Sequence, residues 1–287
     1  MRTEPLGSGV EVFVTEENHF STDTILLAHF AAVRNGERVF ELGTGCGTIP
    51  LLMIREHTPQ SVTALDIQEE AIEMLTQSIA HNLAKGIERA SLIRPVLGDI
   101  REVSENFPAG ECDLVVCNPP YKLDGTGIKS PIGAKNIALH ETQCTLDDIC
   151  KAAKRLLRFG GRFVICQRPE RLTDVLSALR ENELEPKKLR FVQGRADKAP
   201  KLFLCEAKRG AKQGYMDVLP ALIVEDENGF TAEMREIYGT YKDGHSLAPF
   251  EVLPIGKTDS LPLEGKVGNL PTKANGSDEV ETSPIDQ

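Results

Sequence analysis

The sequence predicts an α/β fold, with a seven-stranded, mostly parallel sheet that ends in an antiparallel pair of strands at one edge. Short apolar runs alternate with helix-like stretches, and this alternation is typical of right-handed crossovers between parallel strands. The five apolar runs lie near 38–43, 61–66, 92–97, 112–117 and 162–167. Two further runs, at about 186–193 and 200–208, are joined by the short segment 194–199, which predicts antiparallel pairing.

The remaining segments complete the expected order of elements. Val10 to Val14 predicts a short strand, and Thr22 to Val33 predicts a helix that covers the ligand site. Further helices are expected near 47–57, 68–84, 100–106, 145–158 and 170–182. From residue 242 onward, proline, glycine, serine and charged residues dominate. Because such a segment buries too little apolar surface to offset its ordering entropy, we expect a folded domain over 1–241 and a disordered tail over 242–287.

Composition limits the class of protein. With 287 residues, of which 40% are apolar, the chain can bury one sizeable core, and no apolar run approaches the ~20 residues of a membrane span. The first ten residues lack the layout of a signal peptide. Seven cysteines, an odd number without paired metal-ligand spacing, suit a reducing compartment, and six histidines without a ligand pattern argue against a metal site. We therefore expect a cytoplasmic protein without a metal ion.

A glycine-rich loop follows the first of the five strands. The strand ends in Glu41-Leu42, and the loop reads Gly43-Thr44-Gly45-Cys46-Gly47. Glycines at this point let the backbone approach a ligand at the carboxyl edge of a sheet. The spacing differs from the Gly-x-Gly-x-x-Gly of dinucleotide sites, and no Gly-Lys-Ser/Thr follows as in a phosphate loop.

Acidic residues end the next two strands. Asp66 is placed to accept hydrogen bonds from a ribose diol. Asp99 can accept from an adenine amino group, and Ile100 can pack on the adenine ring. Each carboxylate alone could instead cap the helix that follows it. However, Glu41, Asp66, Asp99 and Asn118 stand at the ends of four successive predicted strands. Chance rarely produces such a series of polar strand ends.

The tetrapeptide Asn118-Pro119-Pro120-Tyr121 follows the fourth strand. Asn118 and Pro119 both precede a proline, so their backbones are held extended, and neither proline has an N–H that competes for acceptors. The Asn118 side-chain oxygen and the Pro119 carbonyl can therefore converge on a planar amino group, while the Tyr121 ring stacks on its base. A Pro-Pro turn that closes a buried strand is the alternative interpretation.

The order of these motifs resembles the class I S-adenosylmethionine-dependent methyltransferases. Asn-Pro-Pro-Tyr resembles the branch that methylates amino nitrogens of bases or of glutamine. Segments outside these motifs are similar to one bacterial family, the transfer RNA adenine-N6 methyltransferases that modify the adenosine beside the anticodon of a valine transfer RNA. These segments are 21–28, 140–141, 156–163, 168–172, 198–210 and 233–239. The resemblance covers roughly Gly7 to Tyr241.

This resemblance implies a Rossmann-like methyltransferase sheet with S-adenosylmethionine as the cofactor. The resemblance implies that Gly43, Gly45, Gly47, Asp66 and Asp99 hold the cofactor, and we also expect cofactor contacts from Thr22, Glu41, Ile67, Ile100 and Asn118. The residues implied to hold the target amine are Asn118, Pro119, Pro120 and Tyr121. The expected partner is the anticodon stem-loop of a transfer RNA, methylated by a monomeric enzyme that binds no membrane.

Three alternatives remain open. A ribosomal RNA base methyltransferase would use the same catalytic motifs. Protein glutamine methyltransferases share the tetrapeptide, but they resemble a helical domain fused to the catalytic one, and 37 residues precede Arg38 here. From another class, the chain could be a cofactor-binding module without catalysis, although such a module would not need an amine acceptor.

Charge gives a mixed signal about an RNA partner. The formal net charge of −10 opposes a surface covered with phosphate-binding residues. Residues 185–213, however, hold nine Lys or Arg against three acids. We expect this positive stretch to contact RNA, although a charge run is also the ordinary composition of a solvated face.

Overall fold

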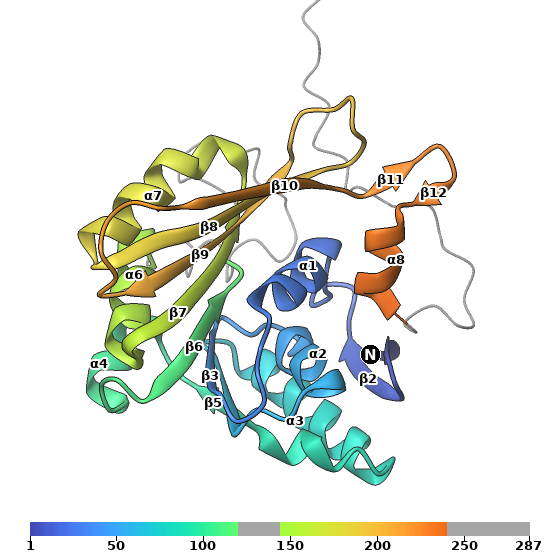
Figure 1. The fold of residues 1–287 in the computed structure, drawn as a ribbon. Helices are drawn as coiled ribbons and strands as arrows, with labels where there is room; N and C mark the ends of the chain where they lie inside the picture. Colours follow the sequence, from blue (N-terminus) through green and yellow to red (C-terminus); the bar gives the residue numbers. More distant parts are fainter. Residues whose placement is uncertain (120–143, 240–287) are drawn as a thin grey trace, which may run out of the picture. The chain divides into compact units, whose positions relative to one another are not determined.

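The structure, a computed structural model, describes residues 1–119 and 144–239. At its centre is an eight-stranded sheet with the order β10-β8-β9-β7-β6-β3-β4-β5 (Figure 1). Its strands are β3 (Arg38–Leu42), β4 (Ser61–Asp66), β5 (Ile93–Leu97), β6 (Cys112–Cys117), β7 (Leu157–Gln167), β8 (Leu184–Gln193), β9 (Leu202–Arg209) and β10 (Asp217–Ile223). The expectations for Pro120, Tyr121 and the tail 242–287 lie outside the described residues.

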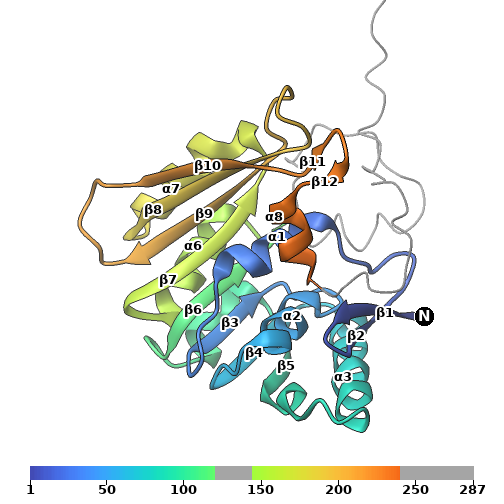
Figure 2. The ribbon, with the colours of Figure 1, turned by 45° about the vertical axis from the view of Figure 1, so that its right-hand side comes forward.

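Helices cover both faces of this sheet (Figure 2). The helices are α1 (Thr22–Ala31), α2 (Thr48–Glu56), α3 (Glu69–Ala84), α4 (Val103–Asn106), α6 (Leu146–Leu156), α7 (Leu172–Glu181) and α8 (Ala232–Tyr238), with 3-10 turns at Glu88–Leu92, Ile100–Glu102 and Pro169–Arg171. The core beside α1, α2, α3 and α8 includes Leu114 and Val116 of β6. The core beside α4, α6 and α7 includes Val115 and Cys117 of the same strand. A strand buried on both faces explains why the sequence shows a continuous apolar run there.

The predicted fold class is confirmed. The strands β3 to β7 pair in parallel, and β9 lies antiparallel between β7 and β8. The predicted antiparallel pair is therefore present, but it does not form the edge of the sheet, because β10 adds parallel to β8. Sequence reasoning missed β10 because Pro220 interrupts it and most of its side chains are exposed. Proline is tolerated in an edge strand, and the register shifts between Leu219 and Leu222 around it.

The strand β7 also begins earlier than predicted, since the helix expected over 145–158 ends at Leu156. The start of that helix agrees with the sequence, because Thr145 and Asp148 form a reciprocal capping box. Its end is set by the sheet, since Leu157 already pairs with Cys112 of β6.

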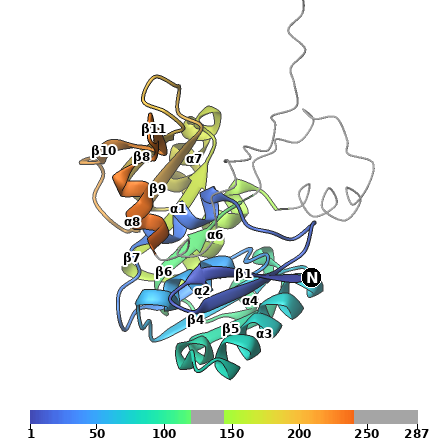
Figure 3. The same ribbon diagram turned by 90° about the vertical axis from the view of Figure 1, so that its right-hand side faces the viewer.

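A hairpin of β1 (Arg2–Gly7) and β2 (Val10–Val14) packs on α3 (Figure 3). Two backbone N–H groups of β2 donate to side chains of α3: Glu11 N–H to Asn82 Oδ1 and Phe13 N–H to Ser78 Oγ, both at 2.9 Å. These bonds satisfy donors that an unpaired strand edge would leave exposed. A second small pair, β11 (Glu225–Asp226) and β12 (Gly229–Phe230), precedes α8. The sequence predicted β2 but not β1, β11 or β12.

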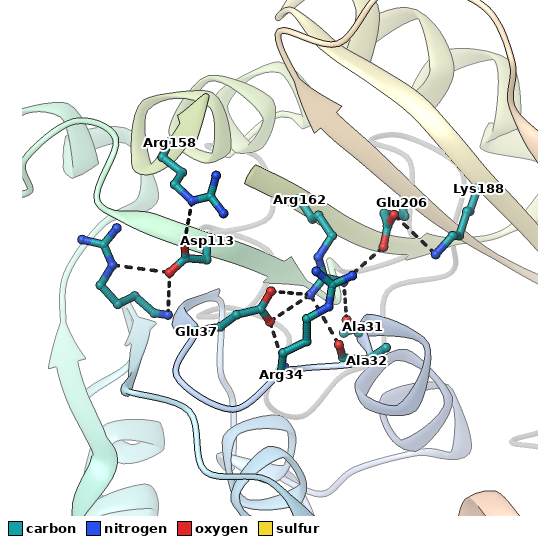
Figure 4. A network of polar contacts seen from close by, with 10 residues as sticks. Ala31, Ala32, Arg34, Glu37, Asp113, Arg158, Arg162, Lys188 and Glu206 are labelled. Atoms are coloured by element: carbon teal, nitrogen blue, oxygen red, sulfur yellow. Dashed lines mark hydrogen bonds and ion pairs between the residues drawn. The ribbon is translucent and has the colours of Figure 1, made fainter. Parts of the chain in front are cut away.

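A buried arginine fixes the carboxyl end of α1 to the sheet (Figure 4). Arg162 of β7 donates to the Ala31 carbonyl at 2.8 Å and pairs with Glu206 of β9 at 3.1 Å. Its other terminal nitrogen pairs with Glu37 at 2.9 Å. The Arg162 side chain is only 6% exposed, so these contacts operate with little screening by water. The network holds α1, β7 and β9 together beside the site described next.

Candidate functional site

The polar strand ends predicted from sequence lie at one edge of the sheet. Leu42 of β3 pairs with Leu65 of β4 on one side and with Cys117 of β6 on the other. Because these strands are parallel and in register, the glycine loop, Asp66 and Asn118 all follow at the same level. This is the carboxyl edge, where open α/β sheets bind ligands.

The glycine loop combines a tight turn with open space. Gly43, Gly45 and Gly47 all have positive φ, at 76°, 53° and 82°. A Cβ added at Gly47 would lie 2.4 Å from Leu75 Cδ1, so close packing against α3 requires glycine there. A Cβ added at Gly43 or Gly45 would meet no atom within 4 Å. At these two positions the backbone borders space that a ligand can fill.

Asp66 fixes the glycine loop. Its carboxylate is 6% exposed, and its two oxygens accept from different segments. Gly45 N–H donates to Oδ2 at 2.8 Å, and Gln68 N–H donates to Oδ1 at 3.0 Å. Helix capping is the alternative role that the sequence predicts for Asp66, and the bond from Gln68 N–H shows that Asp66 does order the start of the next helix. The same carboxylate also connects that helix to the loop expected to hold the ligand.

Glu41 is a second buried carboxyl group beneath the loop. It is 1% exposed and accepts a short hydrogen bond from the Thr44 hydroxyl. Burial raises the pKa of Glu41 well above its ordinary value, the Thr44 bond opposes this rise, and the nearby Asp66 charge adds to it. The buried Asp66 carboxylate favours a ligand that brings hydroxyl donors, whereas the raised pKa of Glu41 favours the neutral form of that carboxyl group.

Asp99 and the two isoleucines lie at the ends of the neighbouring strands. Asp99 accepts from Arg101 N–H at 2.8 Å and from Arg101 Nε at 3.0 Å, so it caps the 3-10 turn that follows it. Ile67 is 38% exposed beside Asp66, and Ile100 is partly buried. The predicted contacts of Asp99 and Ile100 with an adenine ring, and of Ile67 with the cofactor, stay predictions.

Asn118 stands at the end of β6 between two polar side chains. Its Nδ2 donates to Thr24 Oγ1 at 3.2 Å, and the Cys166 thiol donates to its Oδ1 at 3.0 Å. Pro119 is buried directly after it. Pro120 and Tyr121 lie outside the described residues, so their roles stay predictions.

Sequence reasoning missed three residues beside this site. Thr24 and Cys166 contact Asn118 although they lie 94 and 48 residues away in the chain. Tyr238 of α8 shares a hydrogen bond of 2.9 Å with the hydroxyl of Thr22, which is expected from the sequence to contact the cofactor. Thr24 follows Thr22 by two positions, but nothing in the local sequence distinguishes their partners.

Two features of other protein classes are absent from the part of the chain that the structure describes. In residues 1–119 and 144–239, no group of three or more His, Cys, Asp or Glu side chains could hold a metal ion. Within the same residues, no helix is long and apolar enough to cross a membrane.

The fold defines an α/β protein of the Rossmann-like class, with its predicted site residues at the carboxyl edge of the sheet. Residues 8–183 match the family model described as the methyltransferase small domain, and the chain belongs to this family. In overall fold it is similar to a predicted O-methyltransferase from Agrobacterium tumefaciens, with a TM-score of 0.59, 18% identity, and coverage of 75% of this chain and 94% of the other. At that identity the likeness concerns the fold alone.

Two relatives carry the name tRNA1(Val) (adenine(37)-N6)-methyltransferase. The protein from Parabacteroides distasonis is 28% identical over 185 residues, which are 64% of this chain and 74% of the relative. The protein from Tolumonas auensis is 29% identical over 145 residues, which are 50% of this chain and 56% of the relative. The chain thus spans little more than half the length of the second relative.

Proposed function

We propose that this protein is an RNA methyltransferase that transfers a methyl group from S-adenosylmethionine to N6 of an adenine. The adenosine beside the anticodon of a valine transfer RNA, in the cytoplasm, is the proposed substrate. The observation that carries the proposal is the Asn118 amide, held at the carboxyl end of β6 beside the glycine loop, with Pro119 buried after it. The names of the two relatives support the choice of adenine and of transfer RNA.

The residues at the edge of the sheet fit the cofactor. Gly43 and Gly45 border open space, Asp66 supplies a buried acceptor for hydroxyl groups, and Glu41 lies beneath the loop. Asp99 adds a carboxylate at the end of the neighbouring strand. The bound cofactor supplies an activated methyl group on a sulfonium. The chain itself therefore needs to bind, align and exclude water.

The adenine amino group is a poor nucleophile, because its lone pair is delocalised into the ring. A site that accepts both amino hydrogens localises that lone pair as the nitrogen becomes tetrahedral. The Asn118 Oδ1 and the Pro119 carbonyl are the proposed acceptors, and a carbonyl oxygen has two lone pairs, so Oδ1 can accept from more than one donor. The methylated nitrogen is strongly acidic, so no side-chain base with a tuned pKa is required. Tyr121 is proposed to stack on the base.

The structure changes the interpretation of the positive stretch 185–213. Arg190 forms a bidentate pair with Glu233 of α8 at 2.7 and 2.8 Å, and Lys188 pairs with Glu206 at 3.7 Å. These two charges are committed to contacts within the protein. Arg195, Lys198 and Lys201, in the connection from β8 to β9, are exposed. We propose this connection as the part of the stretch that contacts RNA phosphates.

Methyl transfer to RNA tests the proposal directly. Purified protein is incubated with S-adenosylmethionine and unfractionated bacterial transfer RNA, and the nucleosides are analysed by mass spectrometry. We expect N6-methyladenosine to accumulate. The Asn118→Ala variant should lower the single-turnover rate by about two to three orders of magnitude while cofactor affinity stays within a few fold, since only a transition-state contact is lost.

Three results would contradict the proposal. Methylation of ribosomal RNA or of a protein glutamine, without N6-methyladenosine in transfer RNA, would favour one of the other methyl acceptors. Cofactor binding without any transfer would favour a binding module. A near-wild-type rate for Asn118→Ala would remove Asn118 as an amine acceptor.

A further inference from the structure

The two ends of the Asn118 amide are held by partners from two different elements. Thr24 lies in the first turn of α1 and accepts from Nδ2 at 3.2 Å. Cys166 lies near the end of β7 and donates to Oδ1 at 3.0 Å. Cys117 and Ile165 pair in the parallel ladder of β6 and β7, so the residues that follow them, Asn118 and Cys166, are neighbours.

The orientation of an asparagine amide decides its chemistry. The two ends of the group have nearly the same shape, but one is an acceptor and the other a double donor. A rotation by 180° would present an NH2 group to the amino group of the substrate, donor against donor. A site that accepts an amine therefore needs something to select one of the two orientations.

Cys166 can make this selection, and Thr24 can hold the other end of the amide. A thiol has one hydrogen to donate and is a weak acceptor, so Cys166 favours the amide oxygen. A hydroxyl can donate or accept, so with Cys166 bound to the oxygen the Thr24 hydroxyl accepts from the amide NH2 and holds the opposite end. The Cys166 side chain is 0% exposed, so bulk water does not compete for its hydrogen.

The helix that carries Thr24 is itself fixed near both ends. In its first turn, the Thr22 hydroxyl shares a hydrogen bond of 2.9 Å with Tyr238 of α8. At its last residue, the Ala31 carbonyl accepts from Arg162 at 2.8 Å. The Thr24 hydroxyl thus stands at a defined place relative to β6 and does not depend on Asn118 for its position.

We propose that Thr24 and Cys166 are positioning residues that hold the Asn118 amide with its oxygen available to the substrate amine. This role rests on the proposed function. The alternative is that Cys166 only fills space in the core, as buried cysteines often do. Cys205 offers a matched comparison, because it is also 0% exposed and lies on β9 in the core on the opposite face of the sheet.

The experiment compares variants that remove the hydrogen bond with variants that keep it. Thr24→Val and Cys166→Ala remove a partner, Thr24→Ser and Cys166→Ser keep one, and Cys205→Ala removes the same volume elsewhere. The substrate is an RNA stem-loop with an unpaired adenosine in its loop. Single-turnover rates at saturating RNA, the KM for RNA, and the affinity for S-adenosylhomocysteine are measured for each protein.

We expect Thr24→Val and Cys166→Ala to lower the rate about tenfold each, with KM and cofactor affinity within about threefold of wild type. The two serine variants should recover most of the rate, and Cys205→Ala should react like wild type. In an Asn118→Ala background, Thr24→Val and Cys166→Ala should cause no further loss, because the group that they orient is gone.

Different results would overturn the proposed function and the positioning role of Thr24 and Cys166. If the wild-type protein transfers no methyl group to RNA, the proposed function falls and the positioning role falls with it. If the wild type is active, the positioning role alone is overturned by either of two outcomes. One is that Cys166→Ala matches Cys205→Ala in rate, and the other is that the losses persist undiminished in the Asn118→Ala background.

Discussion

Single carboxyl groups at the sheet edge serve both the fold and the proposed ligand site. Asp66 accepts from Gly45 N–H and Gln68 N–H, so it orders a loop and the start of a helix. Glu41 lies beneath that loop and accepts from Thr44. These contacts explain why the capping and ligand-binding interpretations of Asp66 are not exclusive. Substitutions can test the role of Asp66 in cofactor binding and the role of Glu41 in stability separately.

Replacing Asp66 with alanine should weaken cofactor binding. The change removes a buried acceptor, leaves the Gly45 and Gln68 donors without their partner, and costs about 1–3 kcal/mol of binding free energy. Calorimetry with S-adenosylhomocysteine measures this loss. Asp113→Ala is the control, because Asp113 lies at the start of β6 and pairs with Arg38 and Arg158 away from the site. Equal affinities for wild type and Asp66→Ala would remove Asp66 from the cofactor site.

Glu41 should make the stability of the cofactor-free protein depend on pH. Its pKa is raised in the folded state, chiefly by burial, so the folded protein binds this proton more tightly than the unfolded chain does. The associated stability is complete below the ordinary pKa of about 4.5 and is lost as pH rises through the raised folded pKa. Glu41→Gln has no such proton to lose. Its unfolding free energy should therefore decrease less than that of wild type from pH 5 to pH 8.

Denaturant unfolding at several pH values measures this difference. We expect the pH-dependent loss to differ between the two proteins by more than about 1 kcal/mol, since one pKa unit corresponds to about 1.4 kcal/mol. Parallel curves for wild type and Glu41→Gln would mean that Glu41 remains ionised in the fold.

At the scale of elements, α1 connects the site to the rest of the molecule. Its first turn contacts Asn118 through Thr24 and α8 through Thr22, and its last turn is bound by Arg162. The sequence predicted this helix but not its anchors. The anchors come from β7 and α8, and side-chain pairing over such separations leaves no local pattern.

Replacing Arg162 with alanine should strongly destabilise the fold. The change leaves Glu206 and Glu37, whose side chains are 6% and 13% exposed, without their arginine partner. Breaking a buried ion pair in this way costs about 3–5 kcal/mol. Arg38→Ala is the matched control, because Arg38 pairs with Asp113 at 3.4 Å with its side chain 38% exposed, and exposed pairs contribute about 0–1 kcal/mol.

Urea unfolding of both variants measures the two costs. Similar midpoints for Arg162→Ala and Arg38→Ala would show that the buried network does not stabilise α1 on the sheet. A large loss for Arg162→Ala alone would identify the network as the main anchor of this helix.

The centre of the parallel sheet was predictable because β3, β4, β6 and β7 are mostly buried and so appear as apolar runs. The glycine loop and Asp66 were predictable because strand ends in a parallel sheet meet at one edge. In contrast, β10 escaped prediction because it is exposed and contains Pro220. Thr24 and Cys166 escaped it because the contacts of Asn118 depend on how α1 and β7 pack beside β6.

At the scale of the whole molecule, the topology divides the positive stretch 185–213 between opposite edges of the sheet. The strands β7 and β8 are both antiparallel to β9, so they run in the same direction and end at the edge where Asn118 lies. The connection 194–201 is therefore on the site edge. Lys208 and Lys212, at the end of β9 and just after it, are on the other edge.

This division predicts which charges an RNA contacts. Within β8, Arg190 is level with Cys166, because both pair with Leu204 of β9. Cys166 lies beside Asn118, so Arg190 is about three strand spacings, or roughly 14 Å, from the target pocket. The connection 194–201 starts four residues further on, roughly 13 Å along the strand. Phosphates near a nucleotide held at Asn118 can reach this connection.

RNA affinity at several salt concentrations should distinguish two triple alanine variants with the same change in charge. Each replaces one arginine and two lysines, all exposed: Arg195, Lys198 and Lys201 at the site edge, or Arg34, Lys208 and Lys212 at the opposite edge. Because each lost phosphate contact releases about 0.7 fewer counterions from single-stranded RNA, the site-edge variant should flatten the salt dependence by about two units of slope. This change in slope is an upper value, because Lys198 also pairs with Asp197 at 3.2 Å.

The opposite-edge variant should keep the wild-type slope. Parallel slopes for all three proteins would mean that the connection 194–201 is only a solvated face and that RNA phosphates bind elsewhere on the chain.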